Sequence, residues 1–201
     1  MPHAGPDERG PRDADITRWA LAARDGDRDS ATAFIAGTQH HVQRFLTHVV
    51  GAAEAEDLTQ ETYLRAMRAL PRFAARSTAR TWLLAIARRV AVDHIRAAVV
   101  RPRVADLDDW QAVAETVTAT SAPRFDGAVV LRQLLRDLPA DRREAFVATQ
   151  VLGLSYAEAA EVCDCPIGTI RSRVARARED LVAAMAADGD RSTGRHLRAI
   201  G

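Results

Sequence analysis

The sequence has no lysine, and all 28 of its basic residues are arginine. It has only two cysteines, Cys163 and Cys165, and a single C-x-C pair offers too few ligands for a zinc site. Aromatic residues make up 5% of the chain, and the abundance of alanine, leucine and arginine favours helices over sheets. The hydrophobic fraction of 47% is nevertheless large enough to form a packed core.

Long apolar runs are missing as well. No run approaches the roughly 18 residues that a membrane-spanning helix needs, and the N-terminal stretch MPHAGPDERGPRDAD lacks the apolar segment of a signal peptide. We therefore expect a cytoplasmic protein without membrane insertion. There is no glycine-rich phosphate loop, and His40, His41, His48 and His94 have no metal-like spacing with aspartate or cysteine. An enzyme therefore has little support, and no catalytic residue, metal or cofactor is expected.

Proline, glycine and charge divide the chain into five segments. Residues 1–15 are predicted to be a disordered tail, and residues 16–100 are helical in pattern almost throughout. Residues 101–127 form an acidic linker, residues 128–187 regain helical periodicity, and residues 188–201 are a polar tail. The expected fold is all-α, with two helical domains joined by a flexible linker.

The net charge of +1 conceals an uneven distribution. Residues 16–100 carry 12 arginines against 8 acidic residues, whereas the linker carries 3 against 5. A basic first domain and an acidic linker indicate charged partners.

The second helical unit begins with two helices. Leu131, Leu134, Leu135 and Leu138 mark the first, which Pro139 ends, and the next one stops near Gly153.

A further helix and a turn follow. Ser155 and Glu158 fit a capping box, in which the serine oxygen accepts from a free backbone N–H and the glutamate reaches back. Cys163 falls on the apolar face of this helix and is predicted to be a buried core residue. A chain reversal is expected at Asp164, and Pro166 suits the first turn of a new helix.

The last helix is predicted to bury one stripe and expose arginines elsewhere. Its buried stripe comprises Ile170, Val174, Ala177, Leu181 and Met185. Its exposed residues are Thr169, Arg171, Ser172, Arg173, Arg176 and Arg178. Two helices joined by a tight turn, with arginines outside the second, are typical of a helix-turn-helix that binds guanine edges and phosphates. A solvated face is the alternative, but this run lacks the acidic i±4 partners that such a face usually carries.

The stretch LPADRREAFVATQVLGLSYAEAAEVCDCPIGTIRSRVARARE closely resembles the promoter-binding C-terminal region of extracytoplasmic-function (ECF) sigma factors, members of the sigma-70 family. PIGTIRSRVARAR is its most specific part. The family implies binding of the −35 promoter element by the six exposed residues just named. The same four-helix unit occurs in other regulators, so the N-terminal half must distinguish between these classes.

Residues 55–70, AEDLTQETYLRAMRAL, resemble the sigma segment that docks on the clamp helices of core RNA polymerase. Asp57, Gln60 and Glu61 fall at i, i+3 and i+4 and make a polar face suited to an arginine-rich partner. Spacing alone leaves a solvated face equally plausible, and the resemblance favours docking. Tyr63, Met67 and Leu70 are expected to pack inward.

Residues 71–96, PRFAARSTARTWLLAIARRVAVDHIR, resemble the segment that melts and reads the −10 element. A basic surface beside an aromatic ring suits single-stranded DNA. Trp82 taken alone is more often a core residue than a stacking platform. The resemblance assigns −10 DNA binding to Arg76, Ser77, Arg80, Trp82, Arg88, Arg89 and Arg96.

Two residues and one loop depart from the family pattern. Arg89 stands where asparagine is common, the loop AARST at 74–78 lacks the usual glycine and acid, and Asp164 replaces a frequent glycine. Because that loop captures a flipped promoter base in the family, the base preference here is open. Aspartate tolerates a left-handed turn at some cost, so the fold prediction is unaffected.

The resemblance implies a sigma factor whose partners are core RNA polymerase, promoter DNA and, in many members, an anti-sigma factor. Nothing in this sequence identifies such an inhibitor. Asp106, Asp108 and Asp109 suit passage of the linker through a basic channel and equally suit a soluble linker. The alternative function is a freestanding helix-turn-helix regulator, which leaves the motifs of residues 55–96 unexplained.

Overall fold

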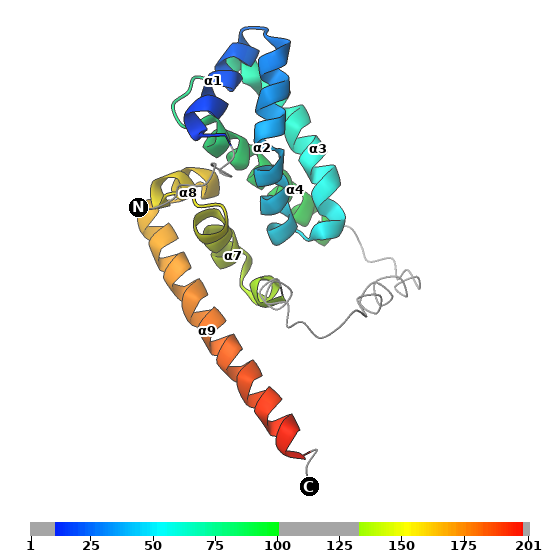
Figure 1. Cartoon of the computed structure of the whole chain (residues 1–201), viewed down its shortest axis with the longest axis vertical. Helices are drawn as coiled ribbons and strands as arrows, with labels where there is room; N and C mark the ends of the chain where they lie inside the picture. Colours follow the sequence, from blue (N-terminus) through cyan, green and yellow to red (C-terminus); the bar gives the residue numbers. More distant parts are fainter. Residues whose placement is uncertain (1–10, 101–132, 199–201) are drawn as a thin grey trace, which may run out of the picture.

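The computed structural model describes residues 11–100 and 133–198, with side chains for residues 11–98 and 133–186. All regular structure in these ranges is helical, which confirms the predicted fold class (Figure 1). The first unit contains α1 (Asp13–Arg24), α2 (Arg28–Val49), α3 (Ala52–Ala69), a short 3-10 turn (Leu70–Arg72) and α4 (Ala79–Val100). The second contains a helical turn at residues 133–137, α7 (Ala140–Phe146), a π-turn (Val147–Val151), α8 (Tyr156–Cys163) and α9 (Ile167–Arg198).

Local signals define the ends of the helices in the first unit. The Asp27 carboxylate accepts hydrogen bonds from the backbone N–H groups of Asp29 and Ser30 at 3.2 and 3.3 Å, which caps α2. Gly51 has a φ of 112°, a conformation that glycine adopts without steric cost, and it lets α3 start directly after α2. Buried side chains such as Phe34 and Phe45 then hold α2 in the core.

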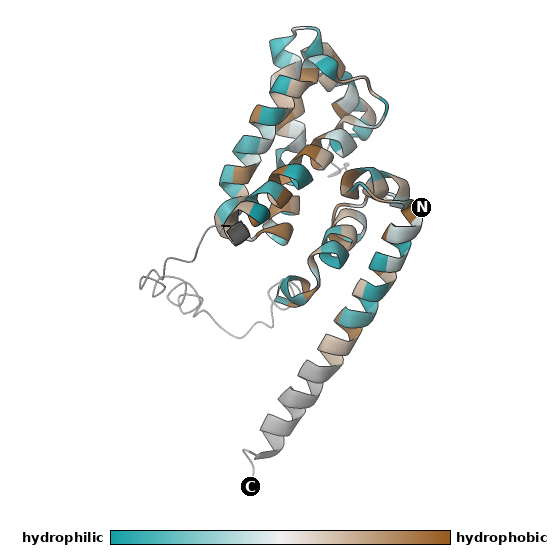
Figure 2. Ribbon diagram, turned by 180° about the vertical axis from the view of Figure 1, so that it is seen from behind, coloured by the Kyte–Doolittle hydropathy of each residue, from teal (hydrophilic) through white to brown (hydrophobic). Residues whose placement is uncertain are grey.

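Helix α4 is the central element of the structure. It packs against α1, α2 and α3 within the first unit and against α8 of the second. Leu83, Leu84, Ala87 and Val90 are almost fully buried. Figure 2 shows hydrophobic residues where helices face one another and hydrophilic residues on their outer sides. One apolar core therefore runs through both units, a closed arrangement that the sequence did not predict.

The predicted helix-turn-helix is present in α8 and α9. Glu158 N–H donates to Ser155 Oγ at 3.2 Å and Ser155 N–H donates to the Glu158 carboxylate at 2.8 Å, so the capping box is confirmed. Asp164 ends α8 in the left-handed conformation, with a φ of 50°. Pro166 lies just before α9, and its carbonyl accepts from the N–H groups of Thr169 and Ile170. Cys163 is buried, as expected.

Three boundaries or burial assignments differ from the sequence prediction. Helix α1 begins at Asp13, inside the stretch assigned to the tail, where the carboxylates of Asp13 and Asp15 favour a helix N-terminus. Helix α9 continues to Arg198 instead of ending near residue 187. Met185 was expected to be buried but is 61% exposed, because the apolar cluster that covers α9 ends with Leu181 and Ala184.

The capping box gives a first prediction. Replacing Ser155 by alanine removes the acceptor for a backbone N–H, so the free energy of unfolding should fall by about 1 kcal/mol. Urea titration followed by circular dichroism measures this change. Thr32→Ala is the matched control, because Thr32 is an exposed residue inside α2 that bonds only to the carbonyl of its own helix. An equal loss in both variants would contradict the capping role.

Candidate nucleic-acid and polymerase interfaces

The face of α3 predicted to dock on polymerase is on the outside of the first unit. Asp57 and Gln60 are exposed, and Glu61 is partly exposed. Leu64, at 54% exposure, extends the same face by one helical turn. Leu64 was not assigned to this face from the sequence. It follows Glu61 by three residues and Gln60 by four, however, and this spacing places all three on one side of a helix.

The inner face of α3 and one bridging ion pair fix its orientation. Tyr63 and Met67 pack against the core and Leu70 is buried, as predicted. Burial raises the pKa of Tyr63 to about 12, although its hydrogen bond with Thr38 at 2.7 Å acts in the opposite direction. Arg65 donates to both Glu61 and Asp93 at 2.7 Å, so the Glu61 carboxylate is held by a residue that also ties α3 to α4.

A pocket of about 320 Å³ lies beside the loop that precedes α4. Arg72, Phe73, Ala74, Arg76, Ser77 and Trp82 line it. Trp82 is partly buried and packs on Phe73 with ring centroids 4.9 Å apart, so one ring serves both the core and the pocket wall. Arg76 is exposed at this site and Ser77 is partly exposed. Three of the residues assigned to −10 DNA therefore meet at one cavity.

The arginines of α4 divide into two groups. Arg89 and Arg96 are exposed and have no ion pair within the described part of the chain. Arg80 instead pairs with Asp13 at 2.9 Å and donates to the carbonyl of Leu152 at 3.5 Å. Arg88 pairs with Glu144 at 2.8 Å. Two of the proposed −10 residues, Arg80 and Arg88, are thus bound to groups of the same chain.

The Arg88–Glu144 ion pair is buried between the two units. The side chains are 23% and 7% exposed, respectively. Burial disfavours the charge of Arg88, but its hydrogen bond and ion pair with Glu144, together with smaller contributions from Cys163 and Asp164, raise the pKa of Arg88 overall. Thr81 Oγ1 also donates to Glu158 Oε1 at 3.3 Å across the same interface. The closed arrangement therefore rests on polar contacts as well as on the apolar core.

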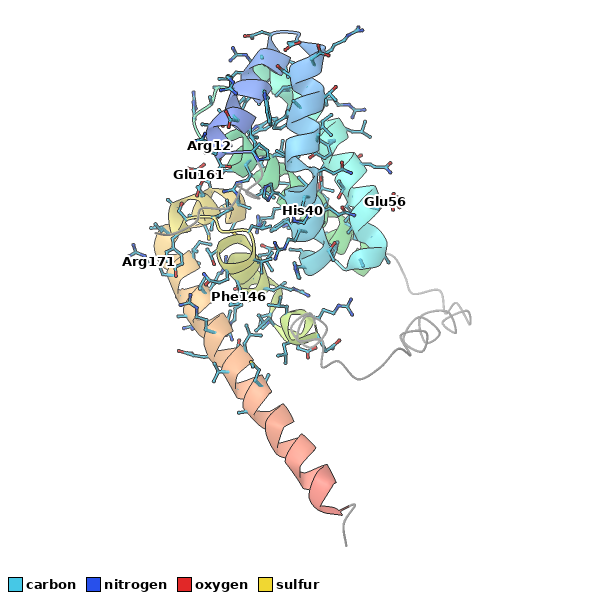
Figure 3. The ribbon with its side chains drawn as sticks, in the orientation of Figure 1. Arg12, His40, Glu56, Phe146, Glu161 and Arg171 are labelled. Carbon is cyan, nitrogen blue, oxygen red and sulfur yellow. The ribbon has the colours of Figure 1, made fainter. Side chains whose placement is uncertain are left out.

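The arginines at the start of α9 also differ from one another. Arg171, Ser172 and Arg176 are exposed, and in Figure 3 Arg171 points away from the helices. Arg173 and Thr169 depart from the predicted exposure, and the Arg173 side chain is only 26% exposed. It pairs with Asp141 at 3.1 Å and donates to Cys165 Sγ at 3.5 Å. Thr169 is partly buried.

Gln150 is a residue of this region that sequence reasoning missed. Arg178 donates to Gln150 Oε1 at 2.8 Å, and the Gln150 amide donates to Thr149 Oγ1 at 3.1 Å. Gln150 lies in the π-turn, which lets this exposed side chain reach α9 from the preceding helix.

Two further groups have displaced pKa values. Burial lowers the pKa of His41, and nearby Arg80 adds to the effect. Burial raises the pKa of Cys163 to about 12, so its thiol stays protonated. Within the described ranges, no three His, Cys, Asp or Glu side chains are placed to hold a metal ion. None of the described helices combines the length and apolarity that crossing a membrane requires.

Comparison with known families matches both units. Residues 34–99 match the model of sigma-70 region 2, and residues 128–181 match that of sigma-70 region 4. The ECF RNA polymerase sigma factor SigC of Mycobacterium tuberculosis is 50% identical over 171 residues, covering 85% of this chain and 91% of that protein. The ECF RNA polymerase sigma-E factor of Escherichia coli K12 is 32% identical over 163 residues, covering 77% and 85%.

Solved structures agree on the fold. CnrH in complex with the cytosolic domain of CnrY aligns with a TM-score of 0.65 at 23% identity, over 87% of this chain and 99% of that one. The sigma factor RpoE of Bartonella quintana, in complex with the anti-sigma factor NepR, aligns with a TM-score of 0.60 at 26% identity, over 78% and 97%.

The two matched regions define the class as a transcription initiation factor of the sigma type. The chain belongs to the sigma-70 family and, within it, to the ECF sigma factors. A freestanding helix-turn-helix regulator is excluded, because residues 34–99 match the region that such a regulator lacks.

The contrast between Arg173 and Arg171 gives a second prediction. Arg173→Ala should lower the free energy of unfolding by up to about 1 kcal/mol, because it breaks the partly buried pair with Asp141. Arg171→Ala should change it by less than about 0.5 kcal/mol. Chemical denaturation of both variants measures the difference. If Arg173→Ala proved as neutral as Arg171→Ala, the ion pair between Arg173 and Asp141 would not stabilise the fold.

Proposed function

We propose that this sigma factor binds core RNA polymerase through α3, opens and reads the −10 element with the pocket before α4, and binds the −35 duplex with α9. The observation that carries the proposal is the pocket that joins Trp82, Arg76 and Ser77. An aromatic wall with cationic and hydroxyl groups can receive an unstacked base and its phosphate. The relatives named above support the proposed binding to core RNA polymerase, since they are called RNA polymerase sigma factors.

Docking on polymerase is assigned to Asp57, Gln60 and Glu61. Two carboxylates and an amide on one face suit an arginine-rich helix, because charge-assisted hydrogen bonds to guanidinium groups are strong. Leu64 offers an apolar contact beside them, and interfaces commonly combine an apolar centre with a polar rim.

Binding of the −35 element is assigned to the exposed side of α9. Arg171 and Arg176 are free to reach guanine edges or phosphates, and Ser172 can contact either. Arg178 is positioned by Gln150 and suits a phosphate contact. The paired Arg173 acts through the shape of the turn, since its guanidinium is held by α7 and by Cys165.

We further propose that the closed arrangement is a resting state. Arg88 cannot hold a DNA strand while Glu144 of the second unit is paired with it. Arg80 contacts the Leu152 carbonyl of that unit as well, in addition to its pair with Asp13. Promoter binding at −10 therefore requires the second unit to leave α4. Polymerase would favour the open state by binding the two units separately, since a partner shifts an equilibrium only through its differential affinity.

Membership of the family supports further proposals about the cellular role. We propose that the protein works in the cytoplasm, where RNA polymerase acts, and has no catalytic activity of its own. An anti-sigma factor is a candidate partner, because the RpoE relative was solved with one.

Reconstituted transcription tests the proposal. Sigma-free core polymerase would be mixed with this protein and a pool of promoter fragments, and the RNA starts would be sequenced. Defined new starts that depend on the protein are expected. Their absence, together with tight binding of the protein alone to duplex DNA, would contradict the sigma role.

Variants of the two proposed interfaces give a third prediction. Asp57→Ala with Gln60→Ala should weaken binding to core polymerase at least tenfold, because both removed groups face the partner. Arg171→Ala with Arg176→Ala should leave polymerase binding unchanged and lower promoter affinity, with a smaller salt slope. Fluorescence anisotropy measures both affinities. Unchanged polymerase affinity in the first variant would refute the docking face.

The resting state gives a fourth prediction. Glu144→Gln removes the charge that faces Arg88, so the ratio of open to closed molecules should rise on the order of tenfold. Energy transfer between dyes on the two units would report the opening, and affinity for a −10 single strand should rise with it.

The matched control is Glu179→Gln, which removes the same charge from an exposed position on α9. Equal distances between the dyes in both variants would show that Arg88–Glu144 does not hold the units together.

A further inference from the structure

The loop before α4 has a second pocket on its other side. This pocket, of about 640 Å³, opens between α1 and residues 75–78. Ala74 lines only the first pocket and Ala75 only the second, whereas Arg76 and Ser77 line both. The loop is therefore a thin partition between two adjoining cavities.

The partition is held in a strained conformation. Ala75 has a φ of 50°, in the left-handed region that costs a residue with a Cβ on the order of 1 kcal/mol. Both ends of the loop are fixed. Thr17 Oγ1 accepts from the N–H of Ala79 at 3.1 Å at the end that leads into α4, and Arg24 donates to the carbonyl of Phe73 at 3.2 Å at the other end. Strain maintained by surrounding bonds is characteristic of ligand clamps.

The chemistry of the second pocket suits a nucleotide. Ala14 and Leu21 give it apolar surface for a base, and the arginines at positions 18 and 76 line it with positive charge for a phosphate. Asp13 also lines it, but this carboxylate is paired with Arg80 at 2.9 Å. Arg18 pairs with Asp15 at 2.9 Å while 70% exposed, an ion pair weak enough to exchange for phosphate.

We propose that the second pocket holds the nucleotide next to the one in the first pocket, so that the loop separates two consecutive unstacked bases of the melted strand. Arg76 would lie at the phosphate between them, since it lines both cavities. This inference rests on the proposed reading of −10 DNA and adds a second base to it.

The test uses polymerase holoenzyme with the full chain and a promoter on which the unaltered protein initiates. The fluorescent base 2-aminopurine is placed at successive non-template positions of the −10 element. Two adjacent positions should brighten on opening. Ala14→Leu, which fills the second pocket without removing a bond, should abolish the signal at one of them and weaken strand binding about tenfold. Ala36→Leu, at an exposed alanine of α2, is the control.

A second variant tests the phosphate contact. Arg18→Gln should lower the slope of log affinity against log salt by about 0.7 for a single strand. Arg28→Gln, at an exposed arginine that lines neither pocket, should leave it unchanged. Brightening at one position only, or an Ala14→Leu variant that retains both signals, would overturn the second site. If no promoter were found on which the unaltered protein initiates, the sigma role itself would be refuted instead.

Discussion

The packing of α4 on two sides is the constraint on which the rest of the structure depends. This helix contacts three helices of its own unit and α8 of the other, so apolar residues occupy most of its circumference. An arginine of α4 that becomes buried between the two units therefore needs an oppositely charged partner, because a buried unpaired charge is costly. Arg88 meets that requirement through Glu144 of the second unit, whereas Arg80 pairs with Asp13 of its own unit.

The same constraint links stability to activity. Residues suited to DNA phosphates are also residues that a carboxylate of the chain can neutralise. In the proposed resting state Arg88 is withheld from nucleic acid, and opening would expose it together with apolar surface of the shared core. The proposed docking residues Asp57 and Gln60 are exposed in the closed form, so on this proposal polymerase would bind before the units separate.

Much of the fold could be predicted from the sequence because its signals are local. The Ser155–Glu158 box, the reversal at Asp164 and the apolar spacing of α9 each involve residues close together in the chain. The partners of the arginines are not local. Arg173 meets Asp141 and Arg88 meets Glu144 across separations that no periodicity encodes. The seven residues assigned to −10 DNA therefore differ in their surroundings: Arg89 and Arg96 are exposed, whereas Arg80 and Arg88 form ion pairs within the chain.

The exclusive use of arginine on these faces has a consequence for how the protein responds to its surroundings. A guanidinium does not lose its proton in the physiological range, so the positive charge offered to DNA is constant between mild acid and mild alkali. Of the groups near the interface, His41 has a pKa lowered by burial and by nearby Arg80, both of which favour its neutral form. Ionic strength, rather than acidity, is therefore the variable that sets the strength of its contacts with phosphate.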